Sequence, residues 1–280
     1  MIDMNNMDSR ERQILSYWIR RIILEQSKRA NIGHIGSALS IADLIASLYS
    51  DILKISSPDD PDRDRFILSK GHAAFALYAA LYMKGWISKD MLDMACLDGT
   101  LLGVHPEHVI PGIDFSTGSL GMGLSFGCGA ALAARLQQSS RRVFVLVSDG
   151  ECNEGSLWEA VMFAAHHRLN NLIAIVDYNN QQALGYTKDV LNLSSLGARW
   201  QAFGWHVKEI DGHHQVQIVN AIECFRKIKE SPCVLIAHTI CGKGISFMER
   251  QIKWHYWPMS DEEYNTALIE IEKKYEKSIY

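Results

Sequence analysis

Five short runs of apolar, often β-branched residues lie along the chain, separated by longer stretches with helical periodicity. The runs cover residues 65–68, 143–147, 172–176, 205–210 and 233–238. Runs of this length that end at Asp, Asn, Ser or Gly are typical of buried strands. Strands that alternate with helices predict an α/β fold, a doubly wound parallel sheet with helices on both faces.

Apolar residues spaced three or four positions apart predict the helices. The clearest pattern predicts a helix over 10–30 and comes from Ile14, Leu15, Trp18, Ile22 and Ile23. Further helices are expected over 40–53, 73–84, 88–97, 124–138, 157–165, 196–203, 216–229 and from 260 onward. The pairs Ser40–Asp43 and Ser260–Glu263 resemble capping boxes at two of these helix starts.

Composition and charge narrow the class of protein. No linker divides the 280 residues, so we expect one domain over 1–280, with a flexible stretch at 1–9 and a C-terminal tail and helix at 255–280. The chain is 48% hydrophobic with a net charge of −4 and no dense basic run, which argues against nucleic acid as a partner. We also expect no signal peptide and no membrane span. Six cysteines without a CxxC pair indicate a reduced, cytoplasmic protein.

Polar residues end two neighbouring strands of the predicted sheet. Asp149 and Gly150 follow the run 143–147, and Asn179 follows the run 172–176. Carboxyl ends of parallel strands meet at one edge of a sheet, where ligands bind. Carboxylate and amide oxygens suit Mg²⁺ or Ca²⁺, and Mg²⁺ usually shares its shell with phosphate oxygens. The pair therefore predicts a metal site for a diphosphate-bearing ligand, although Asp and Asn are also ordinary turn residues.

Three histidines lie in irregular segments close to glycine or proline. His34 stands between two glycines, and His72 precedes a helix whose amino end would favour an anion. Pro106 keeps His105 extended, shortly before the glycine-rich run 117–123, where the backbone can approach a ligand closely. The simpler interpretation is a surface histidine at position 34, a capping histidine at position 72, and glycines that serve helix packing.

These segments together resemble the transketolase family and occur in its order. The segment 148–150 followed by Asn179 resembles the thiamine diphosphate motif. Five further segments resemble other transketolase motifs: NIGHIGSA at 31–38, LSKGHA at 68–73, HPE at 105–107, TGSLGMG at 117–123, and KGISFME at 243–249 followed by WHY at 254–256. The resemblance covers essentially the whole chain and implies the diphosphate-binding half of a transketolase.

The resemblance also implies a set of site residues. Proton transfer and hydroxyl contacts fall to His34, His72, His105 and His255. Thiamine diphosphate is expected to contact His72, Gly118, Ser119, Leu120, Asp149, Gly150, Glu151, Glu154, Asn179 and His255. Mg²⁺, or Ca²⁺, is expected on Asp149, Asn179 and the backbone carbonyl of Gln181. Glu154 and Glu159 would join a carboxylate network between subunits, and the segment 211–213 would lie near the diphosphate.

The same resemblance implies an activity and a partner. Transketolases transfer a two-carbon ketol unit from a ketose or ketose phosphate to an aldehyde. A second domain, which binds the cofactor's pyrimidine ring and supplies an activating glutamate, follows the first in that family. Nothing after His255 could encode it, so we expect a separate C-terminal subunit, with two such pairs forming a heterotetramer.

Some residues depart from the family pattern. Ser148 replaces a glycine, Ile35 replaces a proline, and Tyr256 and Trp257 add bulk where small or basic residues are usual. The bulk at 256–257 is expected near the substrate entrance, where it would disfavour the usual sugar-phosphate substrates. We therefore retain as alternatives another thiamine diphosphate-dependent enzyme, including one of specialised metabolism, a catalytically silent partner subunit, and a plain nucleotide-binding domain. The last alternative is the poorest, because this chain lacks the glycine fingerprint that follows the first strand of such domains.

Overall fold

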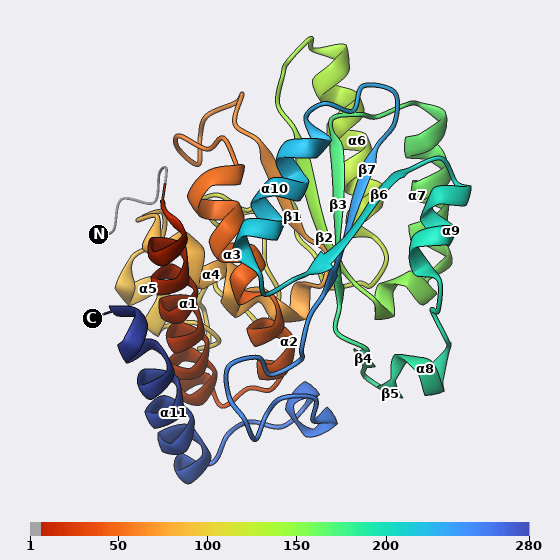
Figure 1. Ribbon diagram of the computed structural model, residues 1–280. Helices are drawn as coiled ribbons and strands as arrows, with labels where there is room; N and C mark the ends of the chain where they lie inside the picture. The colour runs from red at the N-terminus through yellow and green to blue at the C-terminus, as the bar shows by residue number, and fades with distance from the viewer. Residues whose placement is uncertain (1–6, 280) are drawn as a thin grey trace.

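Five parallel strands form the centre of the molecule, in the order β1-β2-β3-β7-β6 (Figure 1). The computed structural model describes residues 7–279. The strands are β1 (Arg65–Leu68), β2 (Val143–Ser148), β3 (Leu172–Tyr178), β6 (His206–Asp211) and β7 (Cys233–His238). All five predicted strands are confirmed, each to within two residues at either end. The buried β3 lies in the middle, so the two strands that carry Asp149 and Asn179 are direct neighbours.

Helices cover both faces of the sheet, which confirms the predicted fold class (Figure 1). The core on one face includes α3 (Ala42–Ser47), α4 (Ala74–Met83) and α10 (Gln215–Phe225), and α1 (Ser9–Ala30) packs in turn against α3 and α4. The other packs against α6 (Gly123–Leu136), α7 (Gly155–His166) and α9 (Leu196–Ala202). Successive residues of β2 alternate between the two cores, with Phe144 and Leu146 in the first and Val143, Val145 and Val147 in the second.

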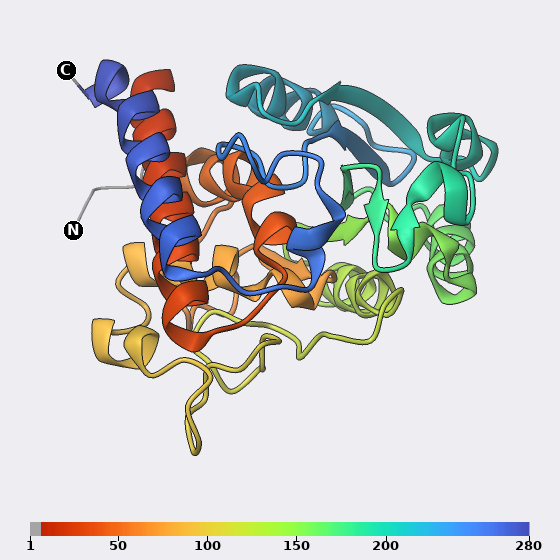
Figure 2. The ribbon, with the colours of Figure 1, turned by 90° about the horizontal axis from the view of Figure 1, so that it is seen from below.

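The last helix, α11 (Asp261–Ile279), lies along α1, as Figure 2 shows from below. Its predicted capping box is confirmed, because the backbone N–H of Ser260 donates to Glu263 and the Glu263 N–H donates to Ser260 Oγ at 3.1 Å. At the other terminus, Asp8 and Glu11 form a capping box that starts α1. Of the stretch expected to be flexible, residues 1–6 lie outside the described residues, Met7 is buried and Ser9 is already helical.

The helix predicted over 40–53 is wrong in its start and its continuity. The structure has α2 (Ile35–Ser40), then α3, then a π-helical turn, η1 (Leu48–Ile52). Ser40 and Asp43 do not form a capping box, because Ser40 Oγ donates to Asp177 at 2.7 Å and Asp43 pairs with Arg20. The helix predicted over 88–97 is shorter, α5 (Lys89–Asp93), and ends before Cys96, which has a φ of 62°.

An antiparallel hairpin that the sequence did not predict follows β3. It consists of β4 (Gln181–Gln182) and β5 (Gly185–Tyr186) and leads into α8 (Thr187–Val190). The hairpin lies beyond the carboxyl ends of the strands (Figure 1). Three short 3₁₀ turns, η2 (Gly71–Ala73), η3 (Gly150–Asn153) and η4 (Ile252–His255), complete the elements. None of the described helices has the length and apolar character needed to cross a membrane.

Candidate functional site

A cavity of about 480 Å³ lies at the carboxyl edge of the sheet. It brings together ten of the predicted site residues: His34, His72, His105, Gly118, Leu120, Gly150, Glu154, Asn179, Gln181 and His255. They come from the turns after β1, β2 and β3, from the start of α2, from the loop that precedes α6, and from η4. The site therefore lies at the carboxyl edge of the sheet, where these turns and loops meet.

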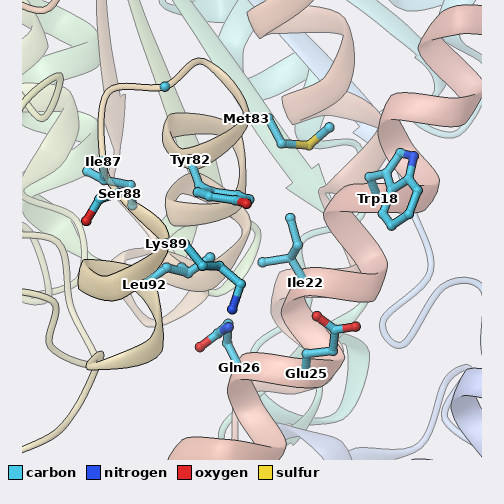
Figure 3. A pocket seen from close by; sticks show the side chains of 11 residues that line it. Trp18, Ile22, Glu25, Gln26, Tyr82, Met83, Ile87, Ser88, Lys89 and Leu92 are labelled. Carbon is cyan, nitrogen blue, oxygen red and sulfur yellow. The ribbon is translucent and has the colours of Figure 1, made fainter. Parts of the chain in front are cut away.

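A second, larger hollow of about 570 Å³ lies between α1 and the α4–α5 segment. Figure 3 shows Trp18 and Ile22 on one side of it, and Tyr82 and Met83 on the other. None of the predicted site residues lines this hollow. The smaller cavity, which brings ten predicted site residues together, is therefore the better candidate for the functional site.

Three of the four histidines form a compact cluster. The ring centroids of His34 and His72 are 5.2 Å apart, those of His34 and His255 are 5.3 Å apart, and those of His72 and His255 are 5.6 Å apart. His72 Nε2 lies 2.8 Å from Ser37 Oγ, which fixes its ring. His34 holds a left-handed backbone with a φ of 60°, and its buried Nδ1 has no hydrogen-bond partner among the described residues. Such strain and an unused nitrogen are features of a binding site.

The fourth histidine approaches the cavity from the glycine-rich loop. Gly118 has a φ of 156°, and a Cβ there would lie 3.2 Å from the His105 ring, so a larger residue would be strained and would crowd the imidazole. Tyr78 donates hydrogen bonds to the backbone carbonyls of Gly103 and His105, at 3.1 and 3.0 Å. These contacts hold His105 beside the cavity.

The clustered histidines are neutral near pH 7. Burial, followed by His105 and Lys70, lowers the pKa of His34. Burial and Lys70 hold the pKa of His72 well below its ordinary value, and burial and His34 lower the pKa of His255 to about 4. A neutral imidazole can donate a proton at one nitrogen and accept one at the other.

A buried ion pair under the histidines was missed by the sequence analysis. Lys70 Nζ lies 2.5 Å from Asp177 Oδ2, and both side chains are fully buried. Asp177 also accepts hydrogen bonds from Ser40, Thr239 and Asn179. Burial raises the pKa of Asp177, but Lys70 and these hydrogen bonds outweigh it, so the pKa lies below its ordinary value. The only sequence signal was a charged residue within two positions of the end of each of two apolar runs, 65–68 and 172–176.

Asp149 and Asn179 lie at the ends of neighbouring strands, as predicted. Asp149 Oδ1 accepts from the Gly150 N–H at 2.9 Å, and Oδ2 accepts from the Asn180 N–H at 2.7 Å and from Thr187 Oγ1 at 3.1 Å. Burial and the neighbouring Asp177 raise the pKa of Asp149 to about 7. A bound cation would favour the ionised carboxylate.

The chemistry of this corner fits a hard cation and a polar ligand. Asn179 Oδ1 accepts from the Gln181 N–H at 2.9 Å, so the chain folds back on itself there. The buried Gln181 Oε1 and Asn153 Nδ2 have no hydrogen-bond partner among the described residues, and both residues line the cavity. No group of three or more His, Cys, Asp or Glu in the described part of the chain could hold a metal. The ligands expected here are of a different kind, one carboxylate, one amide oxygen and one backbone carbonyl, and such oxygens suit Mg²⁺.

Three predicted cofactor contacts do not line the cavity. Asp149 lies fully buried beneath it, and Ser119 is exposed in the loop before α6. Glu151 is fully buried and accepts hydrogen bonds from Ser69 Oγ at 2.5 Å, the Gly121 N–H at 3.0 Å and the Ser148 N–H at 2.8 Å. These three bonds tie the glycine-rich loop to the ends of β1 and β2.

Two further expectations have different outcomes. The segment 211–213 does not lie at the cavity: His213 Nδ1 bonds Asp43 at 2.8 Å and its Nε2 accepts from the Ile240 N–H at 2.9 Å. This pairing was not predictable because Asp43 lies far away in the sequence. Glu154 lines the cavity and Glu159 is exposed on α7, so their predicted role between subunits stays a prediction.

The mouth of the cavity is formed by the hairpin and the residue after η4. Tyr256 lines the cavity, and its Oη donates to the Ala183 carbonyl at 2.6 Å. Tyr186 Oη donates to the Arg250 carbonyl at 3.3 Å. A Cβ on Gly33 would lie 2.1 Å from the Tyr256 carbonyl oxygen, so only glycine permits this approach. Trp257 is 63% exposed and does not line the cavity.

Known proteins resemble this chain over most of its length. The family described as "Transketolase, thiamine diphosphate binding domain" matches residues 11–276. A 6-deoxy-6-sulfo-D-fructose transketolase subunit of Clostridium sp. is 42% identical over 259 residues, which cover 91% of this chain and 94% of that protein. An apulose-4-phosphate transketolase subunit of Phocaeicola vulgatus is 40% identical over 260 residues, which cover 92% of each.

Solved structures of transketolases have the same fold as this chain. The transketolase of Campylobacter jejuni superposes with a TM-score of 0.89 at 30% identity, over 98% of this chain but 43% of that one. The chain thus spans less than half of that transketolase and nearly all of the two relatives that are named as subunits. The protein belongs to the transketolase family, and residues 11–276 are its thiamine diphosphate-binding domain.

Proposed function

We propose that this chain is the thiamine diphosphate- and Mg²⁺-binding subunit of a split transketolase. The enzyme would transfer a two-carbon ketol unit from a ketose or ketose phosphate donor to an aldehyde acceptor. One observation carries the proposal: four histidines and the ends of β2 and β3, which bear Asp149 and Asn179, meet around one cavity. This arrangement combines an oxygen-rich corner for a cation with imidazoles that can exchange protons.

The residues divide the binding of the cofactor between them. Asp149, Asn179 and the backbone carbonyl of Gln181 would hold Mg²⁺, or Ca²⁺ in its place, at the oxygen-rich corner. His72 lies beside the start of α4 and would bind the diphosphate, while Gly118 and Leu120 would border the ring system. Gly150, Glu154 and His255 line the remaining walls. Thiamine diphosphate, when bound, supplies the nucleophilic carbon and the electron sink of the reaction.

The chain's own contribution is proton transfer and orientation. His34, His72 and His255 are neutral near pH 7, so each can accept a proton from a substrate hydroxyl group and return it. His105 stands across from them beside Gly118. A ring of such groups can orient a polyhydroxylated chain through hydrogen bonds to several hydroxyls at once.

A second polypeptide would complete the site. Both relatives that this chain nearly spans are named as subunits, which supports a split enzyme. The partner would carry the pyrimidine-binding domain and the activating glutamate, and two pairs would form a heterotetramer. We place the enzyme in the cytoplasm, where its six unpaired cysteines would stay reduced.

The relatives also suggest the class of substrate. Their names specify a sulfonated sugar and a sugar phosphate, both small polar ketoses. We therefore propose sugars or sugar derivatives of specialised metabolism as substrates of this chain.

Calorimetric titration of thiamine diphosphate with Mg²⁺ tests the proposal. We expect weak binding to the chain alone, tight binding to the chain with its partner, and loss of binding in Asp149→Ala. Asp189→Ala is the matched control, since Asp189 is an exposed carboxylate on α8 outside the cavity. Absence of binding in both wild-type samples would refute the cofactor assignment and favour a catalytically silent subunit.

A further inference from the structure

The mouth of the cavity contains a contact that the proposed chemistry does not use. Tyr256 bridges two segments that are remote in sequence, through the hydrogen bond from its Oη to the Ala183 carbonyl. Its ring centroid lies 5.1 Å from that of His255 and 6.3 Å from that of His34. The phenol therefore spans from the histidine cluster to the hairpin.

The hairpin needs such a contact to keep its place. Each of its strands has two residues, which is too short for independent stability. Its turn and first strand nevertheless line the cavity, through Gln181, Gln182, Ala183 and Leu184. Leu184 is 84% exposed, so the tip has little packing of its own. The hydrogen bonds from Tyr256 and Tyr186 are thus two points at which the C-terminal segment holds the hairpin.

The lining of the cavity changes character from its floor to its mouth. The floor carries imidazoles, the Ser37 hydroxyl group and the Asn153 amide, whose Nδ2 has no partner among the described residues, and all of these suit hydroxyl groups. The more exposed lining is mostly apolar, with Leu184, Val190, Leu191 and the Tyr256 ring on the side of the hairpin, and with Leu120 and one carboxylate, Glu154, elsewhere. No Lys or Arg is among the lining residues. This chain therefore offers hydrogen bonds to the reacting end of a substrate and an apolar rim to its far end.

We propose that Tyr256 is a specificity-determining residue that selects short aldehyde acceptors, because its ring narrows the mouth and its hydroxyl group fixes the hairpin against it. The inference rests on the function proposed above. A two-carbon aldehyde lies within the hydroxyl-binding floor, whereas a five-carbon aldehyde must extend past the Tyr256 ring. The tyrosine is a substrate-selecting group and takes no part in bond breaking.

The test is an acceptor comparison with the chain assembled with its partner. The donor is hydroxypyruvate, and the acceptors are glycolaldehyde and D-ribose. We expect Tyr256→Ala to raise the ratio of kcat/KM for D-ribose over glycolaldehyde about tenfold, with kcat for glycolaldehyde kept. Trp257→Ala is the matched control, because Trp257 adjoins Tyr256 but does not line the cavity, and its ratio should not change.

A second variant separates the ring from its hydrogen bond. Tyr256→Phe keeps the bulk and loses the contact with Ala183, so we expect amide exchange in the paired hairpin strands, residues 181–186, to quicken about tenfold while the rest of the fold is unchanged. An unchanged acceptor ratio in Tyr256→Ala would overturn the inference, and so would unchanged hairpin exchange in Tyr256→Phe. Absence of ketol transfer in the wild-type complex would instead overturn the proposed function, and this inference with it.

Discussion

The histidines show how burial sets the chemistry of single residues. Four imidazoles surround one cavity, and a fully buried lysine lies beneath three of them. Desolvation and the positive charge of Lys70 both oppose protonation, so the cluster stays neutral where an exposed histidine would be partly charged. A neutral imidazole keeps one nitrogen free to accept a hydrogen bond from a hydroxyl group at pH 7, while the other nitrogen can donate one.

The same effect makes stability depend on pH. The pKa of His255 is about 4 in the folded chain, below its ordinary value of 6.5. The unfolded chain therefore binds more protons between these values, and stability is lost as the pH falls from 6.5 towards 4. From His255 alone we expect a loss of about 2 kcal/mol in the free energy of unfolding between pH 7.5 and pH 5. Urea unfolding at both pH values measures it.

The variant His255→Gln is the control for that prediction. Glutamine keeps a polar side chain but does not titrate, so the decrease between the two pH values should be smaller by about the same 2 kcal/mol. An equal decrease in the variant would show that other groups cause the pH dependence.

Local sequence patterns were sufficient to single out many of the candidate residues. Asp149 and Asn179 follow apolar runs, and His34, His72 and His105 stand beside glycine or proline, so each could be selected one at a time. Lys70 and Thr187 could not be found in this way, since their importance lies in partners far away along the chain. Glu151 was misjudged for the same reason: its partners at positions 69 and 121 appear only after folding.

At the scale of elements, polar contacts fix the carboxyl ends of the strands relative to one another. Lys70 follows β1 and pairs with Asp177 of β3, across the end of β2. Asp149 follows β2 and bonds the backbone of Asn180 and the hydroxyl of Thr187 on α8. The strands themselves were predictable from apolar runs, whereas the hairpin β4–β5 was not, because two-residue strands have no periodicity to detect.

Removal of one member of the buried pair should be costly. We expect Lys70→Met to lower the free energy of unfolding by about 3–5 kcal/mol, since the charge of Asp177 stays buried without its partner. The double variant Lys70→Met/Asp177→Asn removes both charges and keeps a polar group at position 177, so it should recover part of the loss. Urea unfolding of the three chains measures this, and an equal loss in both variants would contradict it.

At the scale of the whole molecule, a ligand in the cavity at the carboxyl edge of the sheet would bridge segments from both halves of the chain. Thiamine diphosphate with Mg²⁺ should therefore stabilise the folded state by mass action, about 2.7 kcal/mol at a hundred times its Kd. For a chain of this size we expect a rise in Tm of about 5 °C. Thermal unfolding with and without the two ligands measures it, and EDTA should remove the increase.

Two substitutions distinguish specific binding from a general salt effect. Asn179→Ala removes a predicted metal ligand, so the rise in Tm should disappear. Asn265→Ala changes an exposed residue of α11 and should leave the rise intact. Equal behaviour of the two variants would show that the ligands act elsewhere.

The position of the histidines along the chain determines when the cavity can exist. His34 precedes the whole sheet, whereas His255 follows β7, the last strand to be made. During synthesis the early histidines emerge long before their partner, and the mouth stays without Tyr256 until β7 and η4 have been made. The sheet can assemble as its strands appear, but cofactor capture is a late event in the life of the molecule, and it cannot guide the folding of the first half.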